Sequence, residues 1–89
     1  MGRSVPPWRS RVELELERLT AYRRALPVAD QEALDVLCNE VRQRRAAGGM
    51  LPSHDTWQPL LLNMLVGLMA HVIQLRAQIE ALEEGHRHD

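Results

Sequence analysis

An unbroken heptad pattern of apolar residues runs through the C-terminal third of the chain. The steps between successive members alternate between four and three residues. The members of this heptad stripe are Leu61, Leu65, Leu68, Val72, Leu75, Ile79 and Leu82. Such a pattern places an apolar stripe along one side of a long helix and is typical of helices that pack against other helices. The sequence therefore predicts an all-α protein organised around one long C-terminal helix.

The length of the chain makes self-association the simplest route to a stable fold. With 89 residues it forms at most one domain, and a domain of this size buries only a modest part of its surface. Its single cysteine, Cys38, excludes an intrachain disulfide, and no Cys/His spacing is typical of a zinc site. We therefore expect a homo-oligomer, a dimer in the simplest case, with the seven residues of the heptad stripe at the subunit contact.

Three helices account for most of the sequence. We expect one three-helix domain over residues 10–84, in which a helical hairpin is followed by the long helix. The expected ranges are 10–26, 28–47 and 55–84 for the helices, 1–9 for an irregular arm and 85–89 for a flexible tail.

Local signals set these boundaries. Ser10 and Glu13 have the spacing of a capping box, and Pro27 ends the first helix and opens the second. The pair Gly48-Gly49 favours a left-handed cap at the end of the second helix. Residues 12–16 alternate between apolar and acidic side chains as a strand does, but helix-forming residues dominate and no second strand is present to pair with.

The long helix has two halves of different character. Over residues 60–73 apolar side chains spread beyond the heptad stripe, leaving a narrow strip of small or polar residues: Asn63, Gly67, Ala70 and Gln74. Over residues 75–82 the stripe alone is apolar and charged residues flank it. We expect the first half inside a bundle with the other two helices and the second half against another copy. The predicted assembly is a dimeric helical bundle or coiled coil, with parallel pairing, antiparallel pairing and a four-helix core from two chains all open.

The sequence predicts no enzyme, no cofactor and no metal site. It contains no nucleophile elbow, no glycine-rich phosphate loop and no Glu-x-x-His pair of a di-iron bundle. Cys38 lies on an apolar helix face, where it is expected to act as a small hydrophobic residue. His71 adjoins the heptad stripe and is expected at the edge of the interface, with a pH-responsive contact as the functional alternative.

Arginine clusters are the feature that suggests nucleic acid. The chain has no lysine, and Arg42, Arg44 and Arg45 at the end of the second helix are the candidate phosphate contacts. The formal net charge of −1 gives no global attraction to a polyanion, and no recognition-helix pattern is present. A small nucleic-acid-associated protein that uses arginine clusters on the first two helices and on the N-terminal arm is therefore the alternative interpretation.

The preferred interpretation is a non-enzymatic, homo-oligomeric helical protein that acts as an interaction or scaffold module. Its expected partners are a second copy and another protein. The apolar run at 60–73 is shorter than the roughly 20 residues of a bilayer span and contains Asn63 and His71, so we expect no membrane helix. No signal peptide is recognisable at the N-terminus, and we expect a cytoplasmic protein.

Overall fold

The computed structural model describes residues 6–51 and 55–87. These residues form helices and connecting turns and contain no strand, so the all-α prediction is confirmed. The helices are α1 (Trp8–Glu17), α2 (Thr20–Ala25), α3 (Val28–Gln43), α4 (Arg45–Gly48) and α5 (Trp57–Arg87).

The first predicted helix begins earlier than expected and is divided in two. Pro7 precedes the first turn, so Ser10 lies inside α1 and the predicted capping box is wrong. The arm is therefore helical from Trp8, and a side-chain anchor described below holds this tryptophan in place. Between α1 and α2 the Thr20 hydroxyl donates to the carbonyl of Glu17 at 2.7 Å. This local hydrogen bond competes with the regular helical pattern at the break.

The second predicted helix is also divided, at Arg44, which has a φ of −108° and a ψ of 19°. Pro27 directly precedes α3, and extended backbone at Leu26 makes the joint to α2 tight, as predicted. The predicted left-handed glycine cap is wrong, because no glycine among the described residues has a positive φ. Gly49 instead has right-handed helical backbone angles, with a φ of −68°.

The long helix α5 starts at Trp57, whose backbone N–H donates to the carboxylate of Asp55 just before the helix at 3.1 Å. The helix continues for 31 residues to Arg87. Residues 85–87 of the predicted flexible tail are thus helical, and residues 88–89 lie outside the described part of the chain.

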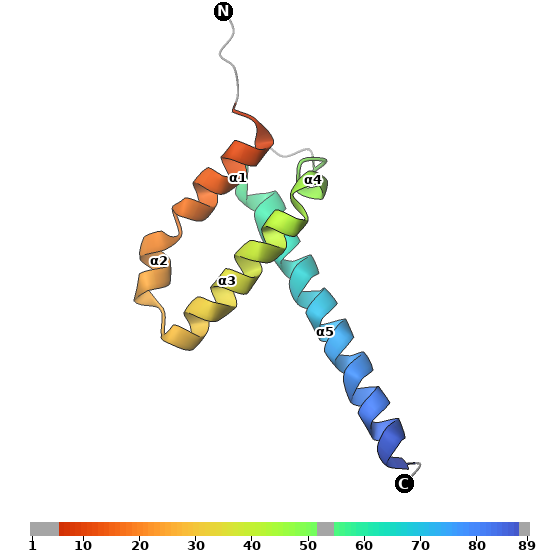
Figure 1. Ribbon diagram of the computed structural model, residues 1–89. Helices are drawn as coiled ribbons and strands as arrows, with labels where there is room; N and C mark the ends of the chain where they lie inside the picture. The colour runs from red at the N-terminus through yellow and green to blue at the C-terminus, as the bar shows by residue number, and fades with distance from the viewer. Residues whose placement is uncertain (1–5, 52–54, 88–89) are drawn as a thin grey trace, which may run out of the picture.

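Helices α1 to α3 form an open hairpin, and the long helix α5 crosses it (Figure 1). Helices α1 and α2 make one arm, α3 makes the other, and α5 crosses the C-terminal part of α3 before projecting away from it. A small core lies at this crossing and consists of Val12, Leu16, Val41, Leu60 and Met64. The molecule measures 72 × 31 × 14 Å along its principal axes, so much of α5 lies beyond the cover of the other helices.

Candidate interaction surface on helix α5

All seven residues of the heptad stripe are exposed in the single chain. Their exposed fractions run from 37% at Val72 to 66% at Leu82. Beyond the crossing with α3, every residue from Leu68 to His86 is exposed. Soluble monomers rarely expose a contiguous apolar surface of this length, and such surfaces mark sites of association.

The chain's own helices cover a different face of α5. Helices α3 and α4 contact the side that carries Leu60, Asn63, Met64 and Gly67, all of which are buried. Asn63 and Gly67 from the strip of small or polar residues thus face α3 and α4. Most other apolar side chains of residues 60–73 face outward. The expectation that the bundle would enclose the first half of the long helix holds for this one face only.

A buried carboxylate organises the crossing of α3 and α5. The side chain of Glu40 is 9% exposed and lies against Gly67, where an added Cβ atom would be 2.6 Å from the Glu40 Cβ. The Glu40 carboxylate pairs with Arg44 on its own helix and contacts Nε2 of His71 on α5 at 2.7 Å. The hydrogen bond from Arg44, followed by that from His71, lowers the pKa of Glu40 below its usual value. Glycine at position 67 is what allows this carboxylate to reach α5.

Two further side chains fix the junction between α3 and α4. The amide of Asn63 donates to the carbonyl of Arg44 at 3.0 Å. The indole N–H of Trp8 donates to the carbonyl of Arg45 at 2.7 Å, and its ring lies against Gly48 and Gly49. These donors give a second hydrogen bond to carbonyl groups that also accept the backbone N–H groups of Gly48 and Gly49, and they tie α1 and α5 to the same point. Trp8, which lies in the segment that was expected to be an irregular arm, thus anchors α1 to the junction of α3 and α4.

A second apolar stripe adjoins the heptad stripe on the outward side of α5. Its members follow the same steps of four and three residues, and all are about half exposed. This flanking stripe consists of Leu62, Val66, Met69 and Ile73. At one end it borders a shallow groove that Met50 and Leu51 also line. At the other end the same steps lead to Arg76 and Glu80, so the apolar surface stops there.

The three arginines predicted as phosphate contacts all take part in ion pairs within the chain. Arg42 binds the Glu13 carboxylate, with its Nε at 3.1 Å from Oε2, and Arg45 approaches the same carboxylate at 3.5 Å. Arg44 pairs with Glu40. The hydrogen bond with Glu13 raises the pKa of Arg42, and the same bond lowers the pKa of Glu13. Their charges thus already have acidic partners, which weakens the case for phosphate binding.

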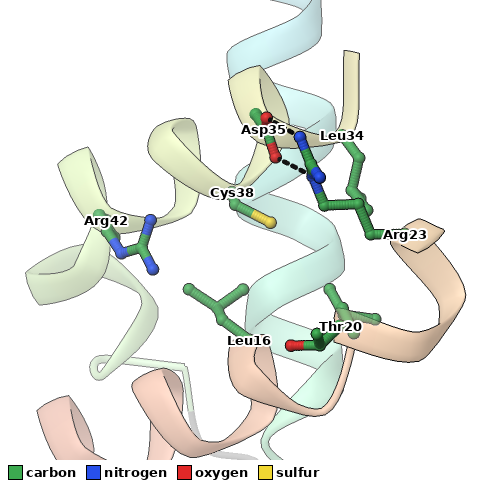
Figure 2. Close-up of a pocket in the computed structure, with 8 residues that line it drawn as sticks. Leu16, Thr20, Arg23, Leu34, Asp35, Cys38 and Arg42 are labelled. Carbon is green, nitrogen blue, oxygen red and sulfur yellow. Dashed lines mark hydrogen bonds and ion pairs between the residues drawn. The ribbon is translucent and has the colours of Figure 1, made fainter. Parts of the chain in front are cut away.

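A small pocket lies between the two arms of the hairpin (Figure 2). It is bordered by the bidentate ion pair of Arg23 with Asp35, whose two contacts are each 2.8 Å, and by Leu16 and Cys38. Burial raises the pKa of the Cys38 thiol, which disfavours the reactive thiolate. Within the described ranges no group of three or more His, Cys, Asp or Glu residues has an arrangement that could hold a metal ion.

Residues Trp57–His86 are long and apolar enough to span a membrane by length and composition, with a mean hydropathy of 1.6 over the most apolar segment. Long apolar helices that pack on other helices have the same properties, so this observation is weak evidence for a span. In this chain His71, which contacts Glu40 of α3, lies within residues Trp57–His86.

The chain belongs to the family described as a domain of unknown function, DUF8156, which it matches over residues 1–89. No curated protein and no solved structure matches it significantly. The residues of the heptad stripe were identified from the sequence, because their spacing is local and regular. The contacts of Glu40 and Asn63 were missed, because each joins residues far apart in the sequence and neither forms a recognisable motif.

Proposed function

We propose that the protein is a non-enzymatic scaffold or interaction module that forms a homodimer through the heptad stripe of α5. The observation that carries this proposal is the exposure of all seven stripe residues on a helix whose other side is occupied by α3 and α4. An apolar stripe with heptad spacing packs well against a second helix of the same spacing, and another copy of α5 supplies one.

The available area is of the right size for a stable pair. Seven aliphatic side chains that are about half exposed present on the order of 600 Å² of apolar surface on each copy. Stable interfaces bury about 800 Å² on each partner, and flanking residues add to the stripe itself. The pairing would also cover the part of α5 that projects beyond the other helices.

The flanking stripe supports the second half of the proposal, which is that the dimer presents a surface to another protein. A helix packed on the heptad stripe covers a sector of about 100° and leaves Leu62, Val66 and Ile73 outside it. Their heptad spacing suits an amphipathic helix of a partner protein. We propose a cytoplasmic location for this assembly.

Nucleic-acid binding is the alternative, and it is less favoured because Arg42, Arg44 and Arg45 pair with Glu13 and Glu40. A phosphate would have to compete with these carboxylates for the same guanidinium groups. The flanks of the apolar stripes also carry acidic residues, which repel an anionic backbone.

Sedimentation equilibrium of the native chain and two variants tests the proposal. We expect a dimer at micromolar concentration, and we expect Leu75→Asp to raise the dimer Kd by about a thousandfold, because it places unpaired charges in the contact at a cost of on the order of 4 kcal/mol. Ala77→Asp is the matched control, since it adds the same charge two residues away on the other side of the helix. A monomeric native chain, or equal effects of both variants, would refute pairing through the stripe.

Two binding experiments test the nucleic-acid alternative and binding to a membrane. Fluorescence anisotropy with labelled duplex DNA at low salt is expected to show no binding, and salt-sensitive binding would favour the nucleic-acid alternative. Flotation with neutral phosphatidylcholine vesicles is expected to leave the protein in the lipid-free fraction. Co-flotation of the native chain with the vesicles would instead indicate that the apolar surface of α5 binds a bilayer.

A further inference from the structure

We infer that the second copy lies parallel to the first and in register with it along α5. This inference rests on the proposed pairing through the heptad stripe and specifies its geometry. The evidence comes from the types of residue within the stripe, the residues that flank it and the position of the other four helices.

The order of the steps assigns each stripe residue to a core position. In a heptad the step from a to d is three residues and the step from d to a is four. The first step of the stripe, from Leu61 to Leu65, is four residues, so Leu61 is a d residue. The remaining d positions are Leu68, Leu75 and Leu82, and the a positions are Leu65, Val72 and Ile79.

This assignment matches the preference of parallel two-stranded coiled coils. Leucine occupies every d position, and β-branched Val72 and Ile79 occupy two of the three a positions. β-Branched residues at a combined with leucine at d favour two parallel strands, because the side chains at the two kinds of layer enter the facing helix at different angles. The exposure of Val72 and Ile79 leaves both available to the second copy.

The residues beside the stripe give an independent reason. In a parallel pair each g residue lies next to the following e residue of the other chain. His71 then lies beside Arg76 of the second copy, and Gln78 lies beside Glu83 of the second copy, whereas Met64, the g residue nearest the hairpin, is buried in the chain's own core. Polar flanks thus meet polar flanks along the half of α5 that projects beyond the other helices.

Antiparallel pairing mixes these flanks. In the antiparallel alignment that pairs Leu65 with Leu82 of the second copy, Arg76 lies beside Met69 of the second copy and Glu83 lies beside Leu62 of the second copy. Each charged group then loses water without gaining a polar partner. The parallel arrangement avoids this mismatch.

Parallel pairing has a consequence for the proposed scaffold. The crossing with α3 lies on the first half of α5, so both copies of helices α1–α4 would lie at the same end of the dimer. The two flanking stripes would then be presented together at that end. A partner with two suitable helices would gain affinity from binding both at once, because the second contact becomes intramolecular.

Disulfide cross-linking tests the direction of pairing. Cys38→Ala removes the native thiol, and Leu82→Cys in that background places one thiol near the end of the stripe. In a parallel dimer the two thiols face each other, whereas in the antiparallel alignment they lie about 25 Å apart along the axis. We expect disulfide dimers to form about tenfold faster than in the control Cys38→Ala with Ala77→Cys, because pairing raises the local thiol concentration.

The inference is overturned if Leu82→Cys forms disulfide dimers no faster than the Ala77→Cys control. It is also overturned if chains that carry Leu65→Cys cross-link efficiently to chains that carry Leu82→Cys. A second measurement leaves the stripe intact: a spin label on Glu83→Cys in the Cys38→Ala background. Parallel pairing predicts a label separation below about 20 Å, and antiparallel pairing predicts one of about 30 Å. Sedimentation of the same samples separates the two proposals, since a monomer contradicts self-association itself, whereas a dimer with distant labels contradicts only its direction.

Discussion

Replacing Gly67 by alanine tests the crossing of α3 and α5 that leaves the apolar stripes facing outward. The new Cβ atom would lie 2.6 Å from the Cβ and 2.7 Å from the Cγ of Glu40. The Glu40 Cβ is fixed by its backbone, so the two helices must separate by on the order of 1 Å to restore an ordinary contact. In a well-packed site such an added methyl group costs about 1–3 kcal/mol.

The intrinsic helix preference of alanine over glycine acts in the opposite direction, by up to about 1 kcal/mol. The net expectation for Gly67→Ala is therefore a loss of about 1–2 kcal/mol, which lowers the melting temperature by about 5–10 °C for a domain of this size. Thermal unfolding followed by circular dichroism at a fixed chain concentration measures this change. The concentration is held constant because self-association contributes to the stability of an oligomer.

Gly85→Ala is the matched control, since nothing lies within 4 Å of a Cβ atom at that position. It receives the same increase in helix preference without the overlap, and we expect it to raise the melting temperature slightly. If Gly67→Ala stabilises the protein as much as Gly85→Ala does, the close approach of Glu40 to α5 is refuted. Sedimentation of both variants should show the native oligomeric state, because neither residue belongs to the heptad stripe.

Two other predictions concern the polar contacts at the same crossing. Asn63→Asp replaces an amide donor by a carboxylate that faces the Arg44 carbonyl, so urea unfolding should show a loss of about 2–3 kcal/mol. The exposed control Gln74→Glu, which lies outside the proposed contact, should show almost none, and equal losses would contradict the buried hydrogen bond. The pKa of Glu40 is lower in the folded chain than its ordinary value of 4.5, so its contribution to stability is complete above that pH and is lost as the pH falls through the lowered pKa. Melting temperatures measured from pH 7 to pH 3 should therefore fall more steeply for the native chain than for Glu40→Gln, and parallel curves would contradict a favourable pairing of this carboxylate.

The elements of this fold that could be predicted from the sequence are those with local causes. The tight joint at Pro27 follows from the restriction that proline places on the preceding residue, and the structure places extended backbone there. The third helix was expected to begin at residue 55, and the Asp55 carboxylate accepts the backbone N–H of Trp57 at the start of α5. The breaks within the first two predicted helices were not anticipated. The break at Arg44 lies where donors from Trp8 on α1 and Asn63 on α5 contact the backbone.

The side of α5 that faces α3 and α4 was not predicted, for a physical reason. In the sequence Asn63 and Gly67 stood out only as part of a narrow strip of small or polar residues on a half-helix expected inside the bundle. In the structure Asn63 is buried because it satisfies a backbone carbonyl, and Gly67 is buried because a carboxylate needs the space. Polarity predicts exposure only when no partner is available, and the partners here lie 19 or more residues away in sequence.

This division of faces connects the fold to the proposed assembly. Polar contacts such as that between Glu40 and His71 depend on direction and distance, so they hold α5 at one position across α3. Apolar stripes such as the one through Leu68 and Leu75 are less directional and gain stability from any well-matched helix. The chain forms its directional polar contacts between its own helices and leaves its apolar stripes exposed. A stable monomer usually buries its apolar residues and exposes its polar ones. A core this small leaves little stability for the isolated chain, so we expect folding and dimerisation to be coupled, with a melting temperature that rises as the chain concentration increases.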